Sequence, residues 1–252
     1  MTRQLRLAQK IYSGTGKLGI SDLLSNEDYD SQRAELLRLA TLHRRQRRLR
    51  LNPSLSLVFE TRFTAWLQIQ EELRWLTHPS DADIAEVLAR CNVLVNYPTE
   101  LSATLFVDGG DNPATLYWIE CIAANAFSLA LRLSGRVLRG RLQESSTGEL
   151  AAVHTLIFKT TACCGPTSEI VWGDNAAEHT APLSAMTRHV LAQDLNPACN
   201  RNCFVAPTAV KRISVTPANP TAGVGLPGLA LPKCRSLRIV PRCKPESGGD
   251  NR

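Results

Sequence analysis

The segment spanning residues 62–77 is predicted to be a helix that carries polar side chains on its apolar side. At about 100° per residue, its apolar residues form one arc, and Gln70 falls inside that arc while Arg74 lies at its edge. Glu71 flanks this pair, and Glu60 just precedes the helix. A buried amide or guanidinium costs several kcal/mol unless it is hydrogen-bonded, so these groups need partners.

Two interpretations of this helix remain open, provided that it is a helix. The favoured one is a structural network that ties the helix to a sheet. In this network Glu60 or Glu71 is the partner of Arg74. The other is a binding site for a small anion or carboxylate. In that site Arg74 would be the fork-shaped donor, Gln70 would orient the ligand, and Glu60 and Glu71 would complete the lining.

A basic run could bind the phosphates of a nucleic acid; it consists of Arg44, Arg45, Arg47, Arg48 and Arg50. No aromatic residue interleaves with this run, however, and Arg48 and Arg50 alternate as outward positions of a strand do. We therefore favour a solvated or carboxylate-paired face, and we regard nucleic-acid binding as the weaker alternative.

Side chains of metal-ligating type occur in the second half of the chain at His154, Asp174, Glu178 and His179. Glu178 and His179 are sequence neighbours, which face apart on regular structure. The eight cysteines include no Cys-x-x-Cys pair. Neither a complete phosphate-binding glycine loop nor a nucleophile elbow occurs. We predict no metal site, and the sequence identifies no cofactor.

The elements that position these residues alternate between helical and strand periods. Residues 1–18 show no clear period and are expected to be a lead-in. Predicted helices span residues 26–45 (with Ser25 as the cap), 62–77 (Thr61), 81–90 (Ser80), 114–123 and 182–195. Predicted strands span residues 48–51, 55–59, 101–107, 127–133, 137–142, 152–158 and 170–172. Because Ser134-Gly135 suits a β-hairpin, we expect an α+β domain over residues 19–196, with an antiparallel or mixed sheet flanked by helices.

The basic character of the chain comes from its C-terminal part. The net charge is +6, but residues 1–196 carry 20 Lys and Arg against 21 Asp and Glu, whereas residues 197–252 carry 9 against 2. Pro and Gly make up 13 of those last 56 residues, so we expect a disordered tail. Neither a signal peptide nor a membrane-length apolar run is visible, which predicts a cytoplasmic protein without a membrane partner.

Several segments resemble a bacterial family known as the domain of unknown function 3501 (DUF3501). The most specific are Leu57-Val58-Phe59-Glu60 and Gln68-Ile69-Gln70-Glu71, with support from Ile20-Ser21-Asp22-Leu23-Leu24 and Leu101-Ser102-Ala103-Thr104-Leu105. The resemblance covers about residues 18–196. It implies a compact cytoplasmic α+β domain without an established activity. Genes of similar proteins often lie near those of rubrerythrin-like and iron–sulfur oxidoreductase proteins, so the resemblance implies partners of those kinds.

Three functional hypotheses follow. The first, which we favour, is an accessory protein that binds a partner in a redox or oxidative-stress pathway, since no strong catalytic motif occurs. The second is an enzyme or sensor that binds a small anion or carboxylate with Gln70 and Arg74. The third is nucleic-acid binding through Arg44–Arg50 and the basic tail. The sequence leaves open whether the chain is an enzyme.

Overall fold

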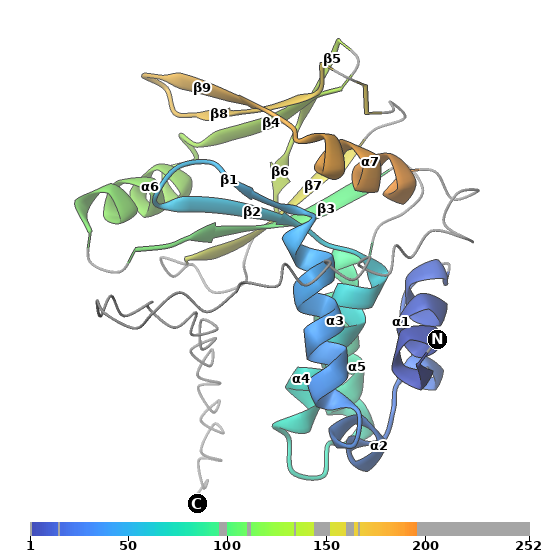
Figure 1. Cartoon of the computed structure of the whole chain (residues 1–252). Coiled ribbons are helices and arrows are strands. Elements are labelled where there is room, and N and C mark those ends of the chain that lie inside the picture. The colour runs from blue at the N-terminus through green and yellow to red at the C-terminus, as the bar shows by residue number, and fades with distance from the viewer. Residues whose placement is uncertain are drawn as a thin grey trace, which may run out of the picture. The chain divides into compact units, whose positions relative to one another are not determined.

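The fold combines a helical part with two antiparallel sheets, as a computed structural model of the chain shows (Figure 1), and strands β1 and β2 lie between α3 and α4 in the chain. The structure describes residues 2–14, 16–95, 100–109, 112–133, 135–143, 152–159, 164–165 and 167–195. The predicted tail, residues 197–252, lies outside the described residues. The α+β class with antiparallel pairing is confirmed, with two sheets in place of one.

The helical part surrounds one central helix. Its elements are α1 (Arg3–Ser13), η1 (Ile20–Asp22), α2 (Asn26–Asp30), α3 (Arg33–Arg45), α4 (Arg62–Arg74), α5 (Asp81–Cys91) and η2 (Asn92–Leu94). Most of α4 is buried, including Phe63, Trp66 and Ile69, so this helix forms the middle of an apolar core. The predicted caps are confirmed, because the Ser25, Thr61 and Ser80 side chains each accept a backbone N–H three residues on.

The expectation that residues 1–18 are a lead-in without regular structure is wrong, because the structure forms a helix there. Residues 3–13 form α1, whose Ala8, Ile11 and Tyr12 are buried in the helical core. Their spacing of three and four residues is the helical signal that the sequence offers. Thr2 caps this helix by accepting the backbone N–H of Leu5 (3.2 Å).

The two sheets enclose a second core. Sheet A has the order β1-β2-β3-β7-β6 and sheet B the order β5-β4-β8-β9, with every neighbouring pair antiparallel. The strands are β1 (Arg48–Arg50), β2 (Leu55–Phe59), β3 (Glu100–Val107), β4 (Ser128–Leu133), β5 (Arg136–Arg139), β6 (Arg141–Leu142), β7 (Val153–Lys159), β8 (Glu169–Gly173) and β9 (Glu178–Pro182). Helices α6 (Pro113–Ala123) and α7 (Ala185–Asp194) contribute to this core and lie at opposite ends of the sheets (Figure 1).

Three predicted elements differ from the structure. The predicted helix 26–45 is interrupted at Ser31 and Gln32, which separate α2 from α3. The predicted strand 137–142 divides at Gly140, after which the chain leaves sheet B and pairs with β7 of sheet A. Gly140 permits this crossing, because a Cβ there would lie 2.8 Å from the ring of Phe158 and 2.9 Å from Leu156. The last helix, α7, begins at Ala185 and not at Pro182 as predicted. Pro182 is instead the last residue of β9, an edge strand that was not predicted and where proline is tolerated.

Candidate functional site

Gln70 is fully buried, as predicted, and its amide binds the backbone of Leu24. Its Oε1 accepts the Leu24 N–H (2.9 Å), and its Nε2 donates to the Leu24 carbonyl (3.4 Å). Both polar ends of the side chain are thereby satisfied within the chain. The contact holds the segment before α2 against α4, which agrees with the structural interpretation.

Glu71 is the acceptor of a second contact between α4 and the preceding helices. Arg33 donates to both of its oxygens (2.8 and 2.7 Å), and the Tyr29 hydroxyl donates to Oε1 (2.6 Å). Burial opposes ionisation, but these hydrogen bonds outweigh it and lower the pKa of Glu71. Burial and the bond to Glu71 raise the pKa of Tyr29. Glu71 is thus an ionised acceptor with three donated hydrogen bonds.

Arg74 has a different partner from the one predicted. Its Nε donates to Asp30 (2.5 Å), and its guanidinium lies 5.8 Å from the centre of the Trp75 ring. Neither Glu60 nor Glu71 is its hydrogen-bonding partner, so that expectation is wrong. Arg74 is half-buried at the edge of the apolar face of α4, in the last turn of that helix. At this position its guanidinium reaches the carboxylate of Asp30 on α2.

Glu60 lies at the other end of α4. Glu60 and Gln70 are ten positions apart, which corresponds to about 15 Å along a helix. Its Oε1 accepts the hydroxyl of Thr104 on β3 (2.8 Å), and its Oε2 lies 3.9 Å from Arg44. The structure therefore brings together Gln70, Glu71 and the segment 24–33, but it separates Glu60 from them. Two concavities of the described surface, both on the sheets, include none of the predicted ligand-binding residues.

The basic run divides between the surface and the interior. Arg45, Arg48 and Arg50 are exposed and Arg44 is half-buried, whereas Arg47 points inward and is 2% exposed. Arg48 donates to Ser56 (3.2 Å) and lies 5.2 Å from the centre of the Phe106 ring, an aromatic contact that the local sequence does not show. Arg50 donates to the carbonyl of Pro53 (3.3 Å). The five arginines therefore do not form one continuous cationic surface.

Arg47 belongs to a buried polar network between α1, α3 and α7. Its Nε and Nη2 donate to the two carboxylate oxygens of Asp194 (3.1 and 2.9 Å). The Tyr12 hydroxyl also donates to Asp194 (2.7 Å). Burial alone would lower the pKa of Arg47, but the Asp194 carboxylate outweighs it and raises that pKa. Burial, followed by the Asp194 charge, raises the pKa of Tyr12.

His43 extends this network to the start of α4. Its Nδ1 faces the Nη1 group of Arg47 (3.3 Å), and its Nε2 faces the Thr61 hydroxyl (3.0 Å). An arginine can only donate, so Nδ1 is the acceptor and the neutral ring carries its proton on Nε2. Burial, followed by the charges of Arg47 and Arg44, holds the pKa of His43 well below its usual 6.5. The network thus ties four helices together, with His43 as a neutral member.

Helix α6 presents an apolar face to solvent, which the sequence analysis did not single out. Leu116 and Tyr117 are 49% and 44% exposed, and Glu120 is the only charged residue between Pro113 and Ala126. The helix face consists of exposed positions at helical spacing: Pro113, Leu116, Tyr117, Glu120, Ala123 and Ala124. The solvent face of a helix is normally polar. The signal was therefore present in the sequence as a missing polar stripe.

Tyr117 is held in place on this face. Its hydroxyl donates to the Asp174 carboxylate at the start of the β8–β9 turn, and its ring meets the Trp118 ring edge-on (5.3 Å between centres). Asp174 also accepts the backbone N–H groups of Ala176 and Ala177 (2.7 and 2.8 Å). Hydrogen bonds from Tyr117 and from the two amides lower the pKa of Asp174. The exposed aromatic ring is thus pre-oriented beside a fixed negative charge.

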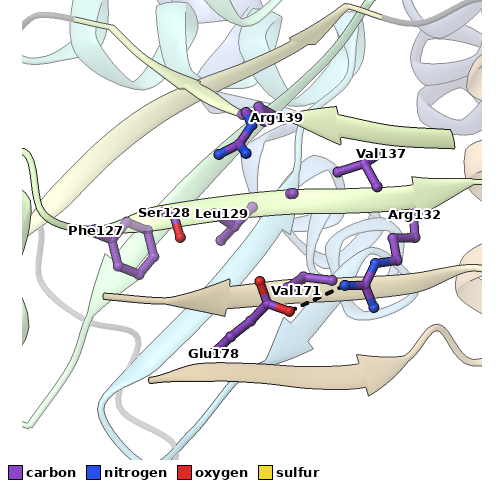
Figure 2. Close-up of a pocket in the computed structure, with 10 residues that line it drawn as sticks. Phe127, Ser128, Leu129, Arg132, Val137, Arg139, Val171 and Glu178 are labelled. Carbon is purple, nitrogen blue, oxygen red and sulfur yellow. Dashed lines mark hydrogen bonds and ion pairs between the residues drawn. The ribbon is translucent and has the colours of Figure 1, made fainter. Parts of the chain in front are cut away.

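A shallow basin forms one concavity on the outer face of sheet B (Figure 2). It encloses about 220 Å³, and its lining includes Ser128, Ala130, Arg132, Arg139, Val171 and Glu178. The second, more open hollow measures about 590 Å³ and lies where the chain crosses between the sheets at Gly140. No group of three or more His, Cys, Asp and Glu side chains in the described part of the chain could hold a metal ion.

The chain is similar to proteins that carry no functional assignment. Residues 17–195 match a family described as "Protein of unknown function (DUF3501)". The fold matches the crystal structure of a novel protein of unknown function from Burkholderia pseudomallei K96243. The identity is 21% and the TM-score 0.61, over 72% of this chain and 100% of that one. No curated protein matches the chain. In the described residues, no helix is both long and apolar enough to cross a membrane.

Proposed function

The chain belongs to the DUF3501 family, and from this premise we propose that it is an accessory protein that binds a redox protein through the solvent face of α6. The observation that carries the proposal is the apolar stripe of α6, with Leu116 and Tyr117 half-exposed side by side. Apolar surface rimmed by polar groups is typical of protein-binding sites, and tyrosine is enriched among the residues that dominate binding energy.

The charges around this face define the chemistry of the partner. Glu120 on α6 and Asp174 beside Tyr117 form a negative rim next to the apolar stripe. We therefore expect a partner surface with an apolar patch flanked by Lys or Arg, since complementary charge steers association and sets the register of an interface. The family resemblance supplies the candidate classes, which are rubrerythrin-like proteins and iron–sulfur oxidoreductases.

Two other observations favour partner binding over the alternative hypotheses. The polar groups of α4 that suggested an anion site, Gln70 and Arg74, already bind Leu24 and Asp30. The arginine run that suggested nucleic-acid binding turns Arg47 into the interior. Trp75 is more exposed (77%) than Leu116 (49%) or Tyr117 (44%), but its neighbours in the chain include the polar residues Arg74, Thr77 and His78.

The experiment measures binding of the full chain to a purified rubrerythrin-like protein and to a purified iron–sulfur oxidoreductase from the same organism. We expect one of them to bind, and Leu116→Lys to weaken that binding by about tenfold or more. The matched control is Met186→Lys on α7, which is also half-exposed (50%) but lies at the other end of the sheets. This control should leave the affinity unchanged.

Each other outcome contradicts a defined part of the proposal. If neither redox protein binds, the partner class is wrong. If Leu116→Lys and Met186→Lys weaken binding equally, the α6 face is not the surface. Light scattering distinguishes a second copy of the chain, because a wild-type dimer that Leu116→Lys converts to a monomer would assign the face to self-association.

A further inference from the structure

The basin on sheet B arises from small side chains in the two central strands. The register places Ser128 opposite Gly173 and Ala130 opposite Val171, and these four residues share the outer face of the sheet. The flanking strands carry long side chains on the same face: Arg139 of β5 is paired with Ala130, and Glu178 of β9 is paired with Gly173. Small residues in the middle and long ones at the rim produce the hollow seen in Figure 2.

The two arginines of the rim differ in their partners. Arg132 donates to Glu169 (2.6 Å) and to Glu178 (3.2 Å), and Figure 2 shows the second of these ion pairs across β8. Arg139 lies on the other side of β4 and is exposed. Within the described residues, no carboxylate pairs with it and no hydrogen bond holds it. Among the residues that the structure describes, Arg139 is therefore a cation of the basin rim with no counter-charge, and Ser128 contributes a hydroxyl to the same lining.

We propose that this basin binds a small organic monocarboxylate, a role separate from the proposed partner surface on α6. The planar guanidinium of Arg139 matches the two oxygens of a carboxylate, and the Ser128 hydroxyl is a further donor on the same face. Ala130, Val171 and Val137 provide an apolar floor for the hydrocarbon part of the ligand.

Size and charge restrict the ligand class. A volume of about 220 Å³ is below the range of about 300–1,000 Å³ that is usual for drug-sized ligands. Glu178 places a carboxylate in the same lining, so a dianion such as phosphate meets about twice the repulsion that a monoanion meets at the same distance. The chemistry therefore favours an anion such as benzoate or isobutyrate over inorganic phosphate.

The test is a benzoate titration of the full, isotope-labelled chain, followed by amide NMR shifts. We expect saturable shifts at Ser128, Ala130 and Val171, with millimolar affinity because the basin is shallow and wet. Arg139→Gln should weaken binding by about tenfold, the equivalent of one charge-assisted hydrogen bond. Arg136→Gln is the matched control. Arg136 is exposed on the same strand and pairs with Leu133 on the other face, so its replacement should leave the affinity unchanged.

A second variant tests the shape of the basin without changing any charge. Ala130→Leu fills the basin and retains all rim charges, and it should abolish the benzoate shifts. The proposal is overturned if wild-type shifts do not saturate or fall outside the basin, or if Arg136→Gln weakens binding as much as Arg139→Gln. It is also overturned if inorganic phosphate binds as tightly as benzoate, which would indicate a general anion patch.

Discussion

The guanidinium of Arg47 and the carboxylate of Asp194 form a two-pronged ion pair in the interior, where their side chains are 2% and 3% exposed. The two residues are 147 positions apart, so this pair fixes the end of α7 to the junction between α3 and β1. The residue spacing of the arginine run gives no sign of this pair, because Asp194 lies 147 positions further along the chain.

Removing one member of this pair should destabilise the fold strongly. Arg47→Met leaves Asp194 as a buried charge, and breaking such a pair typically costs about 3–5 kcal/mol. Urea unfolding of Arg47→Met should show that loss, whereas Arg45→Met at the exposed neighbour should change stability by less than about 0.5 kcal/mol. Equal effects at both positions would contradict the assigned role of Arg47.

Gln70→Leu tests the contact between α4 and Leu24. The substitution leaves the backbone N–H and carbonyl of Leu24 without their buried partners, which should cost about 1–3 kcal/mol. Gln68→Leu on the half-buried side of the same helix serves as the control in the same denaturation experiment. A Gln70 variant as stable as the Gln68 variant would show that the Leu24 contact contributes nothing net.

Acid should weaken the fold through His43. Its folded-state pKa lies well below the 6.5 of an unfolded histidine, so the unfolded state takes up the proton first. The stability is therefore fully present above about pH 6.5. It declines by up to about 1.4 kcal/mol per pH unit as the pH falls from there toward the folded-state pKa. The groups that face His43 are Arg47, Arg44, Thr61, Tyr12 and Phe63, which include two cations that disfavour its charge.

The measurement for this prediction is the free energy of unfolding between pH 7.5 and pH 5, for wild type and for His43→Gln. Other titrating groups contribute to both proteins, so the difference between the two curves isolates His43. We expect the wild type to lose more stability than the variant below pH 6.5. Parallel curves would mean that the folded and the unfolded protein take up the His43 proton equally, which would contradict the lowered pKa of the buried ring.

Gly140→Ala tests the crossing of the chain between the two sheets. A Cβ at this position meets Phe158 and Leu156 at 2.8 and 2.9 Å, so a shift of the core is needed, at a cost of about 1–3 kcal/mol. Gly19→Ala is the control, because nothing lies within 4 Å of its added Cβ. A Gly140 variant that unfolds at the wild-type urea concentration would argue against close packing at the crossing.

Local patterns in the sequence predict most elements of the fold and only part of the contacts. The helix caps Ser25, Thr61 and Ser80 and the hairpin at Gly135 follow from residue chemistry within a few positions, and the structure confirms them. The burial of Gln70 also follows from helical periodicity. The partners of Gln70 and Arg74 do not, because Leu24 and Asp30 lie 46 and 44 residues away, and periodicity contains no information on tertiary pairing.

The candidate sites depend even more on tertiary structure. The basin requires Ser128 and Ala130 of β4 to lie beside Val171 of β8, a register that only the folded sheet defines. The apolar face of α6 is different, since its lack of a polar stripe is visible in the sequence. The exposure of this face could not be predicted from the sequence, because an apolar helix without a polar stripe is equally consistent with a fully buried helix.

The most direct test of the α6 proposal is hydrogen–deuterium exchange of the full chain, alone and with the redox protein that binds it. We predict that the partner slows exchange in the peptides that cover Pro113–Ala123 and the turn at Asp174, while peptides from α4 and from residues 44–50 keep their rates. Slowed exchange in α4 or in the arginine run, with α6 unchanged, would contradict the account.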